Sequence, residues 1–242
     1  MDAIKIVGLT KQYKDVIAVD HLSLTIHKGE LFSLLGVNGA GKTTTIKMLS
    51  CLTQPTSGDA FLNGKSICKE PTAVKAMIGV SPQETAVAPG LTVKENLELM
   101  CGIYGITKQQ QQEKISELTE LLGLNTVIGK KASKLSGGWQ RRLSIAMALI
   151  SEPEILFLDE PTLGLDVLAR SDLWDIIRSL KEKATIILTT HYMEEAEALS
   201  DRIAIMKDGK LLICDTPENI KTSTKTDSIE KAFIQIIKGA EK

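Results

Sequence analysis

The sequence predicts an α/β fold with a mostly parallel sheet and a helical segment inserted between its strands. From residue 150 onward, apolar runs at 154–159 and 184–191 are each followed by a helical pattern. Alternation of this kind is typical of a parallel sheet that is covered on both faces. Between residues 84 and 150 the pattern is helical instead, so this stretch interrupts the strands on either side.

The first third of the chain has the pattern of strands. The stretch HLSLTIH alternates apolar with polar side chains, which predicts a half-buried strand. Residues 30–36 form a more continuous apolar run that ends in glycine, as expected of a buried strand that leads into a loop. The glycine-bounded segment 58–67 predicts a short strand and a turn.

Two later stretches are predicted to be helices with defined ends. In TKQQQQEKISELTELLG, Thr107 and Gln110 form a capping box, and Gly123 stands where the helix would close. The final stretch, DSIEKAFIQIIKG, has apolar residues at helical spacing. Asp227 and Glu230 are its expected capping box, and its apolar face predicts packing on the preceding domain.

Composition limits the classes of function. Lys and Arg number 29 against 30 acidic residues, so no charge excess favours nucleic acid, and no such partner is expected. The four cysteines lie far apart without a Cys-x-x-Cys pair, which indicates a reducing cytosol. No apolar run approaches about 18 residues, and the first residues are too charged for a signal peptide, so no membrane span is expected.

A phosphate-binding loop follows the strand at 30–36. The stretch GVNGAGKT fits Gly-x-x-x-x-Gly-Lys-Thr, between an apolar strand and a helical pattern. Gly36, Gly39 and Gly41 allow the backbone to curl so that its N–H groups and the helix N-terminus face an anion. Lys42 is expected to reach the β- and γ-phosphates, and the Thr43 hydroxyl is expected to ligate Mg²⁺. The motif predicts a P-loop for a nucleoside triphosphate.

An acidic pair stands at the end of another apolar strand. ILFLDEP delivers Asp159 and Glu160 to the carboxyl end of a strand, where ligands collect in open α/β sheets. Asp159 is expected to hold the Mg²⁺ shell. Glu160 is expected to orient or deprotonate water.

A second glycine site needs an explanation. In SKLSGGWQRRL, Gly137 and Gly138 lead into a helical pattern, where each glycine costs about 1 kcal/mol relative to alanine. The hydroxyl of Ser136 and the two glycine N–H groups would form an anion site at a helix start.

These motifs together resemble one family. The P-loop, Gln83 in IGVSPQE, LSGGWQRR, ILFLDEP, LGLD and His191 in TTHYMEEAE occur in the order and at the spacings of the nucleotide-binding subunit of ATP-binding cassette (ABC) transporters. The resemblance covers residues 1–225. It implies an ATPase that uses ATP and Mg²⁺, with a P-loop ATPase core with a mostly parallel sheet, an N-terminal antiparallel β subdomain and an inserted α-helical signature subdomain.

The resemblance also implies domain bounds and roles. Residues 1–226 would be the ABC ATP-binding domain, with the helical subdomain at about 84–150. Residues 227–242 would be a C-terminal helix packed on it. The residues implied in nucleotide binding within one chain are Tyr13, Gly36, Asn38, Gly39, Ala40, Gly41, Lys42, Thr43 and Thr44, with Tyr13 stacking on adenine. Those implied in catalysis are Glu160, His191, Gln83 and Lys42, and those implied in binding Mg²⁺ are Thr43, Gln83 and, through water, Asp159.

Family members bind ATP between two chains. Two cassettes face head to tail, so each site would take its P-loop from one chain and Ser136, Gly137, Gly138 and Asp166 in trans from the other. A second copy of this chain, giving an ATP-dependent homodimer, is therefore an expected partner. Trp139 departs from the family, where glutamine or a smaller residue is usual. It is expected to lie in the core, beneath the signature helix or across the dimer interface.

The resemblance extends to transport. It implies a peripheral protein on the cytoplasmic face of the cell membrane, bound to a separate integral membrane permease. EPTLGLD and the terminal SIEKAFIQI look like the bacterial exporter branch that serves drugs, antibiotics, lipids or ions. Three alternatives stay open: an importer subunit, a soluble ABC ATPase acting on ribosomes, DNA or protein assemblies, and a P-loop kinase. The transported substrate is not encoded in this chain.

Overall fold

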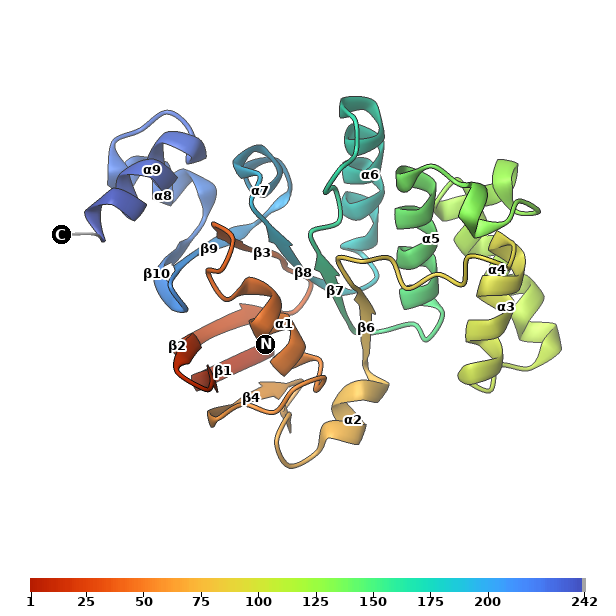
Figure 1. Ribbon diagram of the computed structural model, residues 1–242, viewed down its shortest axis with the longest axis horizontal. Coiled ribbons are helices and arrows are strands. Elements are labelled where there is room, and N and C mark those ends of the chain that lie inside the picture. Colours follow the sequence, from red (N-terminus) through yellow and green to blue (C-terminus); the bar gives the residue numbers. More distant parts are fainter. Residues whose placement is uncertain (241–242) are drawn as a thin grey trace.

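The strands of the computed structural model form two sheets, one antiparallel and one mostly parallel (Figure 1). The structure describes residues 1–240. In spatial order, the antiparallel sheet contains β2 (Val16–His27), β1 (Asp2–Tyr13), β4 (Ser57–Leu62) and β5 (Lys65–Ser66). The other sheet contains β10 (Lys210–Asp215), β9 (Arg202–Lys207), β3 (Leu31–Gly36), β8 (Thr185–Thr190), β7 (Ile155–Asp159) and β6 (Ile78–Ser81). Only the pair β10–β9 in this second sheet is antiparallel, so the predicted fold class is confirmed.

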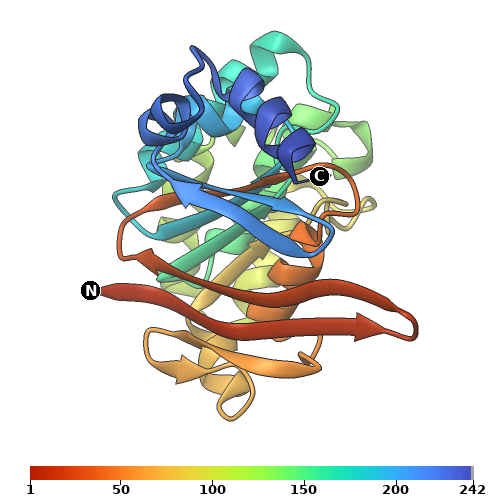
Figure 2. The ribbon, with the colours of Figure 1, turned by 90° about the vertical axis from the view of Figure 1, so that its left-hand side faces the viewer.

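Strand β7 explains why the apolar runs are continuous. Its side chains are buried on both faces. Ile155 and Phe157 pack in one hydrophobic cluster with α1 (Lys42–Leu49), whereas Leu156 and Leu158 pack in another. Helix α1 lies between the two sheets, as Figure 2 shows from the side. The helix that follows the P-loop is therefore buried from both directions, which holds the loop in place.

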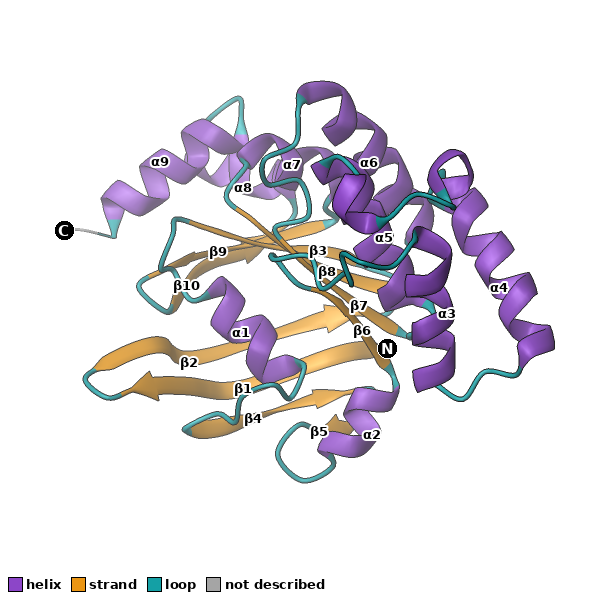
Figure 3. Ribbon diagram, turned by 45° about the vertical axis from the view of Figure 1, so that its right-hand side comes forward, coloured by secondary structure: helices purple, strands orange, loops and turns teal. Residues whose placement is uncertain are grey.

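The other face of the parallel sheet is covered by α5 (Gly137–Leu149) and α6 (Val167–Leu180) (Figure 3). Helix α2 (Pro71–Ala76) lies before β6, at the edge of the antiparallel sheet. Beyond α5, the predicted helical segment contains α3 (Val93–Ile103), α4 (Lys108–Leu121) and two short 3₁₀ helices, η1 (Leu124–Val127) and η2 (Ala132–Lys134). Their apolar faces join the cluster that contains Leu156 and Leu158.

Of the two predicted capping boxes, the structure contains one and not the other. The capping box of Thr107 and Gln110 is confirmed, and Gly123 has the left-handed conformation expected after the helix, with φ of 66°. The capping box predicted for Asp227 and Glu230 is wrong. Ser228 is the N-cap instead, because its hydroxyl accepts the Lys231 N–H at 3.3 Å, while the Asp227 carboxylate pairs with the Lys231 ammonium.

The C-terminal helices form a third small cluster. Helix α9 (Ile229–Gly239) packs on α7 (Met193–Leu199) and α8 (Pro217–Thr224) through Ile229, Ala232 and Phe233. The predicted range 227–242 includes residues 241–242, which lie outside the described part of the chain. Among the helices of residues 1–240, none is both long and apolar enough to cross a membrane.

Candidate nucleotide-binding site

A cleft of about 430 Å³ opens at the start of α1. Its lining contains most of the residues predicted to bind nucleotide within one chain. Of the described residues, those that line it are Tyr13, Ala18, Asn38, Gly39, Ala40, Gly41, Lys42, Thr43, Thr44, Gln83 and Glu160. Gly36, Asp159 and His191 do not line the cleft but contact residues that do. Ala18 is a lining residue that the sequence pattern did not indicate, because a small side chain on a strand carries no motif.

Two glycines of the loop are required by local geometry. Gly41 has φ of 100°, and a Cβ atom there would lie 2.4 Å from the carbonyl oxygen of Ala18. A Cβ atom at Gly36 would lie 2.6 Å from the carbonyl oxygen of Met206. Any other residue would clash with backbone that cannot move aside. The loop is thus held against its neighbours with its first helical amides facing the cleft, which suits an anionic ligand.

The Lys42 side chain is buried behind the loop. Its Nζ donates to the carbonyl oxygens of Gly36 at 2.8 Å and Val37 at 3.2 Å, and lies 3.7 Å from Oε1 of Glu160. Burial lowers the pKa of Lys42, and the carboxylates of Glu160 and Asp159 oppose that shift. The arrangement holds the positive charge of Lys42 beside the cleft. A phosphate bound there would offer the ammonium stronger hydrogen-bond acceptors than the backbone carbonyl groups do.

Asp159 ties β7 to the P-loop helix. Its Oδ1 accepts a hydrogen bond from the Thr43 hydroxyl at 3.2 Å and another from the Thr189 hydroxyl. Oxygen atoms of Thr43 and Asp159 therefore meet beside the cleft, whose lining also includes Gln83, and oxygen donors of this kind suit Mg²⁺. Because Asp159 does not line the cleft, a bridging water fits the predicted indirect contact better than direct ligation.

Glu160 stands at a strained position between Lys42 and His191. Its φ of 47° is left-handed, and its N–H donates to the carbonyl and hydroxyl oxygens of Thr189. This conformation turns the carboxylate into the cleft, with Oε2 3.1 Å from Nδ1 of His191. Such strain persists where surrounding structure enforces it, and it is common at reactive sites. Thr189 holds both acidic residues, a role that only the pairing of β7 with β8 reveals.

Tyr13 lies at the open edge of the cleft. It is 45% exposed, and the Lys11 ammonium lies 5.0 Å from its ring centre. An exposed ring at this edge can stack on a flat ligand group.

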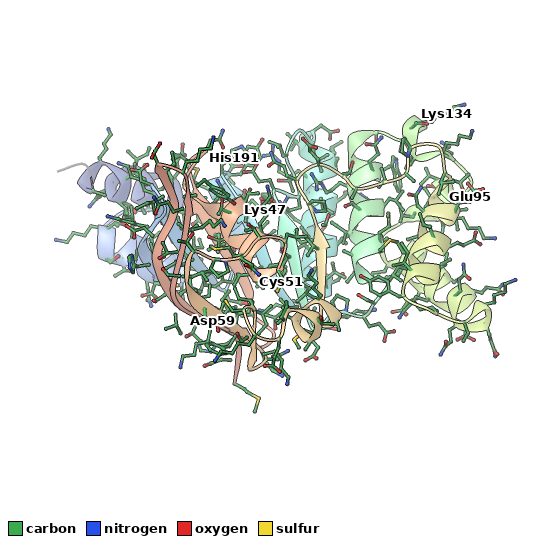
Figure 4. All side chains as sticks on the ribbon, turned by 60° about the horizontal axis from the view of Figure 1, so that its bottom comes forward. Lys47, Cys51, Asp59, Glu95, Lys134 and His191 are labelled. Carbon is green, nitrogen blue, oxygen red and sulfur yellow. The ribbon has the colours of Figure 1, made fainter. Side chains whose placement is uncertain are left out.

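The residues predicted to act in trans lie elsewhere on the chain. Ser136 is the N-cap of α5, and within residues 1–240 its hydroxyl caps no amide of that helix. Asp166 is the N-cap of α6, where its side chain accepts from the Ala169 N–H at 2.9 Å. Figure 4 shows Lys134, two residues before Ser136, well separated from His191 along the length of the molecule. Among the described residues, neither Ser136 nor Asp166 lines the cleft of its own chain.

The two glycines at the start of α5 have no structural requirement within the described chain. Neither has a positive φ. An added Cβ would come no closer than 3.5 Å to any other atom, at Ala169 for Gly138 and 3.9 Å at Leu165 for Gly137. These are ordinary contacts, so alanine would fit both positions. No contact within residues 1–240 therefore requires glycine at either position.

Both tryptophans pack against the larger core cluster. Trp139 is half-buried, with the Arg142 guanidinium 5.0 Å from its ring centre. Trp174 is also half-buried, and its indole N–H donates to Glu195 at 3.1 Å.

Arg141 is a further residue that the sequence pattern did not indicate. It is buried on α5 and donates to the carbonyl oxygens of Pro82 and Gln83, both at 2.6 Å. Burial lowers its pKa, and the nearby carboxylates of Asp159, Glu195 and Glu160 oppose that shift. The sequence feature that could have indicated Arg141 is a charged residue on the side of a predicted helix that faces inward. The contact links the signature helix to the backbone that carries Gln83.

A glycine loop between β3 and a buried helix, with two carboxylates at the end of β7 on the far side of β8, defines a P-loop nucleotide-binding protein of the α/β class. The sequence profile described as ABC transporter matches residues 19–163. A second profile, of an AAA domain, matches residues 131–196. The chain belongs to the ABC transporter family and is its ATP-binding cassette, an ATPase.

Two curated relatives are named for multidrug transport and for drug resistance. The probable multidrug ABC transporter ATP-binding protein YbhF of Escherichia coli (strain K12) is 41% identical over 235 residues, which are 95% of this chain and 40% of the relative. The daunorubicin/doxorubicin resistance ATP-binding protein DrrA of Streptomyces peucetius is 40% identical over 222 residues, covering 91% of this chain and 67% of the relative. This chain thus spans two fifths of the Escherichia coli relative's length.

Solved structures share the whole architecture. The ATP-binding subunit of an ABC transporter matches with a TM-score of 0.86 and 26% identity, covering 97% of this chain and 99% of that one. The dimeric post-hydrolysis state of the ATP-binding cassette MJ0796, bound to ADP and Pi, matches with a TM-score of 0.80 and 28% identity, covering 88% of this chain and 98% of that one.

Proposed function

We propose that this chain drives export through a separate membrane permease, as a homodimer that closes on ATP at the cytoplasmic face of the cell membrane. The observation that carries this proposal is the pair of glycines, Gly137 and Gly138, whose bare backbone nothing in residues 1–240 requires. A second copy of the chain, with its nucleotide bound against the amides of these two glycines, explains why glycine stands at both positions. The names of two relatives, one for multidrug transport and one for drug resistance, support export as the direction of transport.

Each residue of the cleft then has a chemical role. Lys42 leaves the loop carbonyls for the γ-phosphate, and the amides of the P-loop hold the remaining phosphates. Glu160 accepts the proton of the attacking water, while His191 orients that carboxylate from its other side. When bound, Mg²⁺ would neutralise phosphate charge, held by Thr43 and Gln83 directly and by Asp159 through water. Tyr13 stacks on the adenine ring.

Dimerisation is tested with a variant that binds ATP without turning it over. Glu160→Gln is expected to dimerise with ATP and to stay monomeric with ADP, because only a γ-phosphate reaches Ser136 of a second chain. Light scattering with each nucleotide measures the mass. Adding Ser136→Arg should abolish the dimer, whereas Ser133→Arg, at an exposed serine three residues earlier, should not. Dimers that ignore the nucleotide would contradict the proposal.

A groove of about 400 Å³ supports docking of the permease beside the loop that contains Gln83. Its lining is largely apolar and includes Leu52, Ile78, Pro82, Ala86, Met100, Tyr104 and Met147. Of the lining residues, Leu52 and Tyr104 are 68% and 46% exposed, and large apolar side chains exposed in this way are typical of a surface covered by a partner. Arg141 bonds the carbonyl oxygens of Pro82 and Gln83, so closure around ATP would move one wall of the groove.

A charge placed in this groove should uncouple the complex. Tyr104→Glu is expected to reduce recovery of the permease at least about 10-fold, because an interface would have to bury an unpaired carboxylate. The ATPase activity of the isolated subunit should stay within about twofold, since Tyr104 is remote from Glu160. Pull-down from detergent extract, with the membrane protein encoded by the neighbouring gene, measures this.

The control is Ile234→Glu on α9, because Ile234 and Tyr104 are 45% and 46% exposed. Equal loss of permease in both variants would contradict docking at the groove. Association with ribosomes or DNA and no membrane partner would favour the soluble alternative. Uptake with the same permease would overturn only the direction of transport.

A further inference from the structure

Glu195 on α7 is a buried carboxyl for which the proposed chemistry has no use. It is 0% exposed, and its Oε1 accepts the indole N–H of Trp174 at 3.1 Å. Burial raises the pKa of Glu195, and the nearby Thr190, Thr162 and Trp174 groups and the charge of Arg170 oppose that shift. Its other oxygen, Oε2, has no hydrogen-bond partner among the described residues. A buried oxygen without a partner is costly, so the position calls for an explanation.

Two residues that affect the pKa of Glu195 also carry unpartnered polar atoms. Within residues 1–240, Oγ1 of Thr162 and Nε of Arg170 are likewise buried without a hydrogen bond, and both residues oppose the rise in the pKa of Glu195. Thr162 stands two residues after Glu160, and Arg170 stands four residues after Asp166. Thr190 directly precedes His191. Three segments that carry site residues thus converge on one side chain.

A chain of contacts leads from this convergence to His191. The hydroxyl of Thr190 accepts the Tyr192 N–H at 2.9 Å. The Tyr192 ring lies 4.2 Å from the His191 ring, centre to centre, and the Arg170 guanidinium lies 4.5 Å from the Tyr192 ring centre. Both neighbours of His191 are therefore held by groups that meet at Glu195.

We propose that Glu195 is a positioning residue that holds His191 against Glu160 by tying together the segments of Thr162, Thr190 and Arg170. A neutral carboxyl suits this position, because it can keep the Trp174 bond on Oε1 and donate from Oε2 to Thr162, which satisfies two of the unpartnered atoms. The proposal rests on the proposed function, in which His191 orients Glu160. It adds the group that orients His191.

The test compares ATP hydrolysis by variants at Glu195 and at its exposed neighbour Glu194. Glu195→Gln is expected to keep kcat within about threefold, since an amide is neutral and can both accept and donate. Glu195→Ala is expected to lower kcat about 10-fold or more with KM for ATP within about twofold, because misplacing a catalytic group costs rate and spares binding. Glu194→Ala should match the native chain.

Epistasis decides whether Glu195 acts through His191. In a His191→Ala background, Glu195→Ala should cause no further loss of kcat, because the group that it positions is absent. A loss of the same size in both backgrounds would overturn the proposal. So would a glutamine variant as poor as the alanine variant, which would show that the charge is needed.

A second variant covers the case in which Glu195→Ala does not fold, as judged by its melting temperature. Trp174→Phe keeps an aromatic ring at this position but removes the N–H that Glu195 accepts, together with the five-membered ring of the indole. When made in the native chain, it is expected to lower kcat about threefold. When made in the His191→Ala variant, it is expected to cause no further loss of kcat. A fall in both backgrounds would overturn the inference. If His191→Ala alone hydrolyses ATP at the native rate, the proposed role of His191 fails first, and that outcome is seen before any Glu195 variant is made.

Discussion

Glu160→Gln is expected to bind ATP as the native chain does and to hydrolyse it at least about 100-fold more slowly. The substitution keeps the shape of the side chain and the backbone bonds to Thr189 that hold its left-handed conformation. It removes the carboxylate that takes the proton of water and that faces both Lys42 and His191. Single-turnover hydrolysis and fluorescent-nucleotide titration separate the two effects.

The control for this variant is Glu113→Gln, which changes an exposed carboxylate on α4. It should leave both hydrolysis and binding unchanged. A Glu160→Gln variant that retained more than about a tenth of the native rate would show that another group accepts the proton. Loss of ATP affinity in this variant would instead assign Glu160 a role in binding.

Lys42→Ala is expected to weaken ATP binding about 10- to 100-fold, and hydrolysis should fall with it. Hydrogen bonds to charged groups contribute about 1.5–3 kcal/mol, and about 1.4 kcal/mol corresponds to tenfold in affinity. The effect should be smaller for ADP, because the ammonium is proposed to bond the γ-phosphate. Titration with each nucleotide measures the difference.

Lys47→Ala is the matched control, since Lys47 lies on the same helix but is exposed near its C-terminal end (Figure 4). It should bind ATP as the native chain does. Comparison with Glu160→Gln then assigns the roles, because one variant should lose affinity and the other turnover. If both variants lost affinity equally, the proposed division between binding and catalysis would be wrong.

Local patterns were sufficient for most of the fold. Strand β7 was predicted because a strand buried on both faces must be apolar throughout, and the structure confirms that burial. The capping box at Thr107 was predicted because its two partners are three residues apart. The same rule failed at Asp227, because the Ser228 hydroxyl caps the helix in its place and the Asp227 carboxylate pairs with the Lys231 ammonium.

The sequence by itself determined the P-loop, the acidic pair and the serine–glycine site, because each is a run of adjacent residues that can be recognised without its distant partners. Only the tertiary structure brought Thr189 to Asp159, Arg141 to the carbonyl of Gln83, and Glu195 to the neighbours of His191. Those contacts join strands and helices far apart in the chain, and a single threonine, arginine or glutamate has no spacing that marks it. The structure also decided that Gly137 and Gly138 serve no contact within the described chain, since a pattern of letters does not reveal the space around a Cβ atom.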